Sequence, residues 1–214
     1  MKTIRISEEE ISQFSDRKRV QFINSLSGFK PCNLIGTING EGNSNLSIVS
    51  SVFHLGANPA LLGLIIRPDS VPRDTLINLR ETKACTLNHV NQSIMAKAHQ
   101  TSARYPKEIS EFKACGLTEE ILEDFKAPFV AESNIKMALQ FVREEKLPEN
   151  GCHFIITRIT DVYIPEESYR EDGRVDIHKA DTVCVGGLDT YYKTERLHRF
   201  SYAKPSSPLS ILED

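Results

Sequence analysis

Hydroxyl and amide side chains crowd one stretch of the sequence that otherwise has the pattern of a β-strand. Residues 43–54, NSNLSIVSSVFH, carry four serines and two asparagines among apolar residues. Hydroxyls and backbone N–H groups in a turn can hold phosphate oxygens without a formal charge, and they can equally bind the edge of a flat heterocycle. Taken alone, a polar strand that faces solvent is the simpler interpretation of this stretch.

Basic side chains stand at the next strand end and helix start. Arg67 lies at the end of the apolar run 60–68, and Arg73 and Thr75 open a predicted short helix. An anion at this position would meet a guanidinium, a hydroxyl and free backbone N–H groups. The spacing is weak by itself, because many helices begin with Arg and Thr, and Asp74 is more simply a capping residue.

A third polar cluster contains His99, Thr101 and Ser102, and Glu111 and Phe112 further on could anchor the same loop. A serine close to a histidine could indicate a hydrolase, but the sequence has no GxSxG elbow. The segment GGLDTYY at 186–192 offers two aromatic faces. It does not match GxGxxG and follows no βαβ pattern, so a dinucleotide-binding fingerprint is not supported.

Composition excludes several classes of protein. The five cysteines are scattered without a CxxC pair and the six histidines show no HxH or HxxxH spacing, so we predict no metal site and no disulfide framework. We expect reduced, mostly buried thiols and a cytoplasmic location. A net charge of −3 argues against nucleic-acid binding. No apolar run reaches the roughly 18 to 20 residues of a membrane span, and three glutamates at 8–10 interrupt any secretory pattern.

The elements that must position these residues are mostly short strands. Strand-like runs with turn signals between them indicate a β-barrel or sandwich with peripheral helices, not alternating βαβ units. Asn-Gly at 39–40 predicts a hairpin. The expected strands are two runs within 31–53, a strand at 60–68 covered on both faces, and strands at 83–90, 136–141 and 153–165. At 136–141 a helix stays open as the alternative, because the run is short.

Helices are expected to be short and peripheral. Ser7 and Glu10 match a capping box, and a second helix should run over 15–26 and stop at Gly28. Further helical segments are expected at 73–82, 91–98 and 117–125, the last with Thr118 as its cap. We divide the chain into a helical segment at 1–29, a barrel domain at 30–200 and an extended C-terminal arm at 201–214.

Together and in order, these segments resemble the flavin reductase-like family, whose fold is an FMN-binding split barrel. The resemblance covers roughly residues 30–192 and is carried by KPCNLIGTINGEGNSNLSIVSSVFHLGANPALLGLIIRP, RDTLINLRETKACTLNHV and AHQTSARYPKEISEFKACGLT, followed by GCHFIITRITDV and GGLDTYY. No single piece is diagnostic, whereas their order and spacing are fairly specific. The chain departs from the family at Cys32 and Asn33, and at His89, where apolar residues are common.

The resemblance implies a flavin site. The strand around Ser47 would follow the flavin ring edge and ribityl chain, the arginines would face the phosphate, and residues 98–102 would close over the flavin. His99 is the catalytic candidate, and Tyr191 covers the substrate side or comes from a partner subunit. The implied cofactor-binding residues are Asn45, Ser47, Ser50, Ser51, Val52, Arg67, Arg73, Thr75, Asn88, Ala98, Thr101, Ser102 and Tyr191.

The implied activity passes a hydride from NADH or NADPH to bound FMN, preferred over FAD, and then to an acceptor. The family resemblance also implies a homodimer, and a monooxygenase is one partner that could use the reduced flavin. Because a flavin brings its own redox chemistry, the lack of a catalytic acid-base pair in the sequence is consistent with this function. Two alternatives stay open: an FMN-binding electron carrier without catalysis, and a β-barrel interaction domain without a cofactor.

Overall fold

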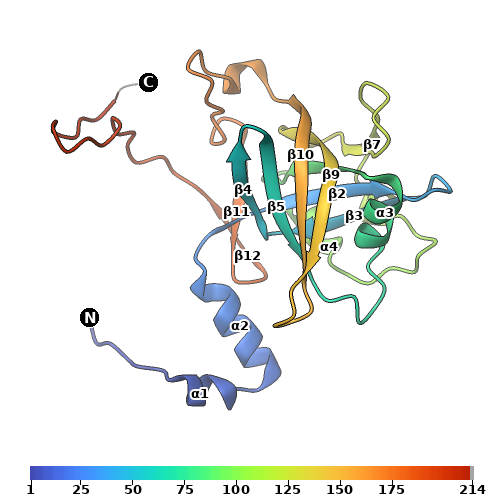
Figure 1. The fold of residues 1–214 in the computed structure, drawn as a ribbon, viewed down its shortest axis with the longest axis horizontal. Helices are drawn as coiled ribbons and strands as arrows, with labels where there is room; N and C mark the ends of the chain where they lie inside the picture. The colour runs from blue at the N-terminus through green and yellow to red at the C-terminus, as the bar shows by residue number, and fades with distance from the viewer. Residues whose placement is uncertain (213–214) are drawn as a thin grey trace.

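The computed structural model describes residues 1–212 and is built around a seven-stranded antiparallel sheet that curls into a barrel (Figure 1). The strand order is β3-β2-β6-β9-β10-β5-β4. Its members are β2 (Asn33–Ile38), β3 (Ser44–Val49), β4 (Val52–Ala57), β5 (Ala60–Ile66), β6 (Ala84–His89), β9 (Lys136–Lys146) and β10 (His153–Tyr163). The sheet therefore begins and ends with strands that are consecutive in sequence, joined only by Ser50 and Ser51.

Smaller sheets and short helices surround the barrel. A three-stranded sheet pairs β1 (Lys30–Pro31), β11 (Val183–Gly186) and β12 (Thr190–Lys193), and a two-stranded sheet pairs β7 (Glu119–Glu120) with β8 (Phe129–Val130). The helices are α1 (Glu8–Ser12), α2 (Asp16–Leu26), α3 (Asp74–Thr82), α4 (Met95–Gln100) and α5 (Glu111–Cys115), with a 3₁₀ turn at Glu166–Ser168. The mainly β fold with peripheral helices is confirmed.

The core lies on both faces of β2. Leu34 packs with α4, α5 and β11 through side chains such as Ala98, Phe112 and Val183. Ile35, the next residue, packs with the barrel interior and α3. Successive side chains of a strand point to opposite faces, so one strand divides the two clusters. We expected such double cover for 60–68, which was wrong: most of β5 is only half-buried, and β2 is the enclosed strand.

Most of the expected elements are present. The hairpin at 39–42, the capping box of Ser7 and Glu10 and the strands at β6, β9 and β10 are confirmed. The helix expected at 91–98 begins later, at Met95.

The helical turn expected at 117–125 was wrong. The helix lies earlier, in α5, and ends at Gly116 with a φ of 68°. Beyond it, the backbone N–H and hydroxyl of Thr118 both donate to the Glu132 carboxylate, at 3.1 and 2.9 Å, so Thr118 does not cap a helix. Glu119 then pairs with Val130. Tertiary pairing has overridden local helix propensity here.

Both ends of the chain run outside the barrel (Figure 1). The C-terminal segment folds back on itself through bridges between Phe200 and Ile211 and between Lys204 and Ser207. The last two residues of the expected arm, 213–214, lie outside the described residues. Among residues 1–212, no helix is both long and apolar enough to cross a membrane.

Candidate functional site

An open cleft of about 980 Å³ lies along β3, the β3–β4 link and the end of β5. The loop 67–73, the start of α3, the segment 99–107 and the turn before β12 complete its walls. Eleven of the predicted site residues line it: Asn45, Ser47, Ser50, Ser51, Arg67, Arg73, Thr75, His99, Thr101, Ser102 and Tyr191. Segments that are far apart in the sequence are therefore brought to one cleft.

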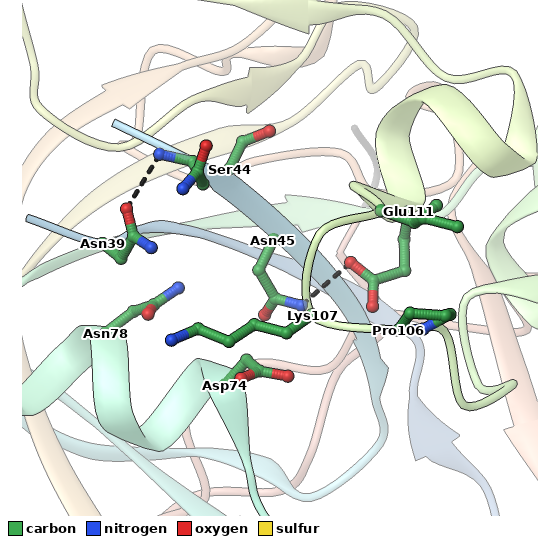
Figure 2. Close-up of a pocket in the computed structure, with 10 residues that line it drawn as sticks. Asn39, Ser44, Asn45, Asp74, Asn78, Pro106, Lys107 and Glu111 are labelled. Carbon is green, nitrogen blue, oxygen red and sulfur yellow. Dashed lines mark hydrogen bonds between the residues drawn. The ribbon is translucent and has the colours of Figure 1, made fainter. Parts of the chain in front are cut away.

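A chain of hydrogen bonds between hydroxyl and amide groups, which ends on the Glu111 carboxylate, forms the wall on β3. The hydroxyls of Ser47 and Thr75 lie 2.8 Å apart, and the Thr75 hydroxyl donates to Asn45 Oδ1 at 3.0 Å. Asn45 Nδ2 donates to Glu111 Oε2 at 2.8 Å, and the same carboxylate oxygen accepts the Leu46 backbone N–H at 3.0 Å. Figure 2 shows Glu111 reaching from α5 to Asn45. This chain joins α3, β3 and α5 at the cleft.

The direction of these bonds decides what the wall can offer a ligand. Because a carboxylate only accepts, Glu111 fixes the NH₂ of Asn45 toward itself and leaves the Asn45 oxygen facing Thr75. The Thr75 proton is then used on Asn45, so Ser47 donates to Thr75. Toward the cleft both hydroxyls present lone pairs. Thr75 would have to release Asn45 before its hydroxyl could donate to a phosphate oxygen.

Glu111 is the site residue whose role the sequence interpretation missed, since it was noted only as a loop anchor. Burial is the main cause that raises the pKa of its carboxyl, and the bonds from Leu46 and Asn45 act in the opposite direction. The anchoring prediction itself is confirmed for Phe112, whose side chain is buried in the core. The sequence signal for this role was the triplet at 110–112, in which a charged residue stands beside an aromatic one.

Two other hydroxyls on this wall bind the chain itself. Thr101 is buried; its hydroxyl accepts the Ile48 N–H at 3.0 Å and donates to the Ala98 carbonyl at 2.8 Å. The Ser51 hydroxyl donates to the Ile65 carbonyl at 2.8 Å, and the Ile65 N–H donates to the Ser51 carbonyl at 3.1 Å. Thr101 therefore latches the 99–107 segment onto β3, and Ser51 joins the β3–β4 link to β5.

The opposite end of the cleft is basic. Arg67 is exposed at the end of β5, and Arg73 precedes α3, where its Nε donates to the Pro68 carbonyl at 3.1 Å. Arg104 and Lys107 also line the cleft, and the sequence interpretation did not select them. Their signal was present as basic residues in the ARYPK segment. Four cationic side chains therefore line the cleft, against three acidic ones, Asp74, Glu111 and Asp189. The guanidinium groups of Arg67 and Arg73 favour an anionic group on the ligand at the 67–73 loop.

A histidine–tyrosine pair stands at the rim. His99 Nδ1 lies 2.8 Å from the Tyr191 hydroxyl, and the rings meet edge to face with centroids 5.7 Å apart. Burial is the main cause that raises the pKa of Tyr191 well above its ordinary value, so the phenol stays protonated. The pair connects α4 to β12 across the mouth of the cleft.

Three predicted residues do not line the cleft. Asn88 is fully buried; its Nδ2 donates to the Leu34 carbonyl and the Thr86 hydroxyl, and its Oδ1 accepts the Val130 N–H at 3.0 Å. Ala98 is buried in the core cluster around Leu34, and Val52 packs against the barrel interior. Each of these three side chains packs or hydrogen-bonds inside the protein and does not face the cleft.

Comparison with known proteins identifies the family. The model of the flavin reductase like domain matches residues 29–195. The chain belongs to this family. Among solved structures, it is similar to a split barrel protein of Shewanella frigidimarina NCIMB 400 that is assigned as a flavin reductase, with 53% identity, a TM-score of 0.91, and coverage of 94% of this chain and 100% of the other. The split barrel fold is thereby confirmed.

Two more distant structures share the fold. Nitrilotriacetate monooxygenase component B from Bacillus cereus is 21% identical, with a TM-score of 0.81 and coverage of 93% and 99% of the two chains. The flavoredoxin of Desulfovibrio vulgaris (Miyazaki F) is 22% identical, with a TM-score of 0.70 and coverage of 84% and 92%.

The donor set of the cleft fits a flavin nucleotide. Flavins combine a flat heterocycle, a hydroxylated chain and, in the nucleotide, an anionic phosphate. The cleft offers uncharged oxygens along β3 and guanidinium groups on the 67–73 loop. Among residues 1–212, no group of three or more His, Cys, Asp or Glu side chains is arranged to hold a metal ion.

Proposed function

We propose that this flavin reductase-like protein is an FMN-dependent oxidoreductase that takes a hydride from NADH or NADPH and delivers the electrons to an acceptor. The observation that carries the proposal is the polarity of the cleft, with hydroxyl and amide groups of Ser47, Thr75 and Asn45 along β3 and guanidinium groups on the 67–73 loop. That division matches the two parts of FMN, a neutral ring with its ribityl chain and a charged phosphate.

Each wall has a separate task in this proposal. Arg67 and Arg73 hold the phosphate, since charge-assisted hydrogen bonds to guanidinium groups are about twice as strong as neutral ones. Ser47 accepts a hydrogen bond from the ribityl chain or the ring edge, because its own proton is used on Thr75. Ser50 and Ser102, to which the structure gives no side-chain hydrogen bond among residues 1–212, are free to donate. A bound flavin supplies the hydride-accepting centre and the two-electron chemistry.

His99 and Tyr191 are proposed to act on the nicotinamide or acceptor side. Tyr191 remains protonated and can donate to His99 Nδ1, which places the imidazole proton on Nε2. His99 then holds a proton at the exposed mouth of the cleft, where a reduced acceptor needs one. Substitution of His99 by Ala should lower turnover more than it lowers the melting temperature. Equal thermal destabilisation without a kinetic change would make His99 purely structural.

The deciding experiment is a visible absorption spectrum of the purified protein with FMN, recorded before and after anaerobic NADH and, separately, NADPH. Loss of the oxidised flavin bands at a rate that depends on the protein supports the reductase. Stable FMN binding without bleaching by either nucleotide would indicate the electron-carrier alternative. A protein that binds no flavin would favour the interaction domain.

The assembly and setting complete the proposal. We propose a homodimer in the cytoplasm, because β4 at the sheet edge exposes Phe53 and Leu55 and all five cysteines are free thiols. One acceptor to test is a monooxygenase that uses released reduced FMN, because the similar Bacillus cereus protein is named as component B of a monooxygenase. Light scattering measures the dimer, and retention of flavin on gel filtration separates bound from released FMN.

A further inference from the structure

Five charged or titratable side chains gather behind the loop that joins β5 to α3. Lys146 Nζ donates to Asp69 Oδ1 at 3.0 Å, and His153 Nε2 lies 3.3 Å from the same oxygen. His153 Nδ1 lies 2.6 Å from Glu144 Oε1. Arg80 Nε donates to Glu144 Oε2 at 2.8 Å, and its Nη2 lies 3.9 Å from Asp69 Oδ2. We call these five residues the Asp69 cluster.

The Asp69 cluster is held together at neutral pH. His153 is its buried member, with 1% of the side chain exposed between the two carboxylates. The Lys146 hydrogen bond is the main cause that lowers the pKa of Asp69 to about 2, and the nearby His153 acts in the same direction. The Arg80 hydrogen bond is the main cause that lowers the pKa of Glu144. Both acids are therefore ionised, and Asp69 has a cation on each side.

The position of Asp69 in the chain gives the cluster a consequence at the cleft. Arg67 and Arg73 line the cleft on either side of it, whereas Asp69 contacts the end of β9 and the start of β10. The Arg73 side chain also donates to the Pro68 carbonyl at 3.1 Å. The loop is therefore fastened at its middle through Asp69 and at its own turn through Pro68, and neither of these two residues lines the cleft.

We propose that Asp69 is a positioning residue, which through Lys146, His153 and Arg80 holds the 67–73 loop so that Arg67 and Arg73 bind the phosphate of the flavin nucleotide. This inference rests on the proposed function. It assigns a binding role to a residue that does not touch the ligand, and it explains why an acidic residue stands between two phosphate-binding arginines.

A purely electrostatic role and a positioning role of Asp69 predict opposite changes in phosphate affinity when its charge is removed. Asp69 is an anion close to an anion-binding site, so removing its charge should strengthen phosphate binding if only long-range Coulomb energy mattered. If Asp69 positions the loop, removing its charge should weaken phosphate binding. Riboflavin, which lacks the phosphate, should be unaffected in the second case.

The test compares FMN and riboflavin on Asp69→Asn by quenching of flavin fluorescence in the full chain. We expect the dissociation constant for FMN to rise about tenfold, the scale of one charge-assisted hydrogen bond, with that for riboflavin within twofold of the parent. The matched control is Asp172→Asn, which loses the same charge from ion pairs with Arg174 and Arg199 at 2.8 and 2.7 Å. It should leave both constants unchanged.

Two results would overturn the positioning role. One is tighter or unchanged FMN binding by Asp69→Asn, and the other is an equal loss of FMN and riboflavin, which would mean general disruption. Arg73→Ala separates this from the proposed function. If Arg73→Ala leaves the ratio of the FMN dissociation constant to the riboflavin dissociation constant unchanged, the assignment of Arg73 to the phosphate is itself wrong. If the FMN-to-riboflavin ratio of dissociation constants rises in Arg73→Ala but not in Asp69→Asn, only the positioning role is wrong.

A second pair of variants keeps the question open to test if Asp69→Asn folds poorly. Lys146→Met removes the hydrogen-bonding partner of Asp69 from an exposed position, and Lys193→Met removes an equal charge that pairs with Asp181 at 3.3 Å. Lys146→Met should weaken FMN binding about fivefold more than Lys193→Met, as expected for partial loss of one charge-assisted contact. Equal effects of the two substitutions would contradict the proposal.

Discussion

The two ends of the cleft are built in different ways. The hydroxyl-lined wall follows β3. Ser47 on this strand, Ser51 in the β3–β4 link and Thr101 after α4 are already bonded within the chain. The cationic end belongs to a loop, and its arginines are positioned by residues behind them. A strand fixes its side chains through the backbone ladder, whereas a loop needs additional contacts to do the same.

The contrast implies a division of work. The strand wall has a fixed hydrogen-bond polarity before any ligand arrives, which suits an uncharged ring that must be held in one orientation. The loop end supplies charge, and charge determines affinity more than orientation. Substitutions at the loop should therefore separate FMN from riboflavin, and substitutions on the wall should not.

The largest effect is expected at the loop. Arg67→Ala combined with Arg73→Ala removes two guanidinium partners of the phosphate and should weaken FMN binding by about 100-fold, or about 3 kcal/mol. Riboflavin affinity should change by less than twofold. Fluorescence titration of both flavins checks this. An equal loss of affinity for FMN and riboflavin would mean that the loop does not bind the phosphate specifically.

The next largest effect is a loss of protein stability at Thr101, whose hydroxyl binds β3. Thr101→Val keeps the shape of the side chain but leaves the part-buried Ile48 N–H without its acceptor, which should lower the free energy of unfolding by about 1–2 kcal/mol. Urea unfolding measures it. Ser102→Ala, at an exposed neighbouring position, is the control and should stay within about 0.5 kcal/mol of the parent.

Sequence predicted the arrangement of this cleft better than the role of each residue. Turn chemistry at Asn39 and Gly40 and the apolar run of β5 define strands by local rules, and those strands were found. Asn45 and Asn88 look alike in sequence, since both are asparagines within predicted strands. Only the fold shows that Asn45 lines the cleft and Asn88 is used internally.

Glu111 and Asp69 illustrate the same limit. Each acts through partners more than 60 positions away in the chain, Leu46 for one and Lys146 for the other. No local pattern records such a pairing, because it depends on which strands meet in the barrel. The helix expected at 117–125 failed for the same reason, since Glu132 and Val130 bind that segment from a distance.

A smaller effect should distinguish the wall as an acceptor. Ser47→Ala removes an oxygen that can only accept from the ligand, and should weaken FMN and riboflavin alike by about three- to tenfold, or about 1 kcal/mol. Equal losses for the two flavins would support the assignment of Ser47 to the ring or ribityl chain. A loss for FMN alone would place Ser47 at the phosphate and erase the contrast between the ends.

The smallest effect is a pH dependence of stability at Glu111. Burial raises the pKa of this carboxyl above its ordinary 4.5, so the folded chain holds the proton more tightly than the unfolded chain does. The contribution of Glu111 to stability is therefore fully present below pH 4.5 and declines as pH rises through the folded-state pKa. Glu111→Gln lacks this decline, so its stability relative to the parent should improve as pH rises from 4 to neutrality. Urea midpoints across that range measure it, and a difference independent of pH would mean that the Glu111 carboxylate is as well solvated folded as unfolded.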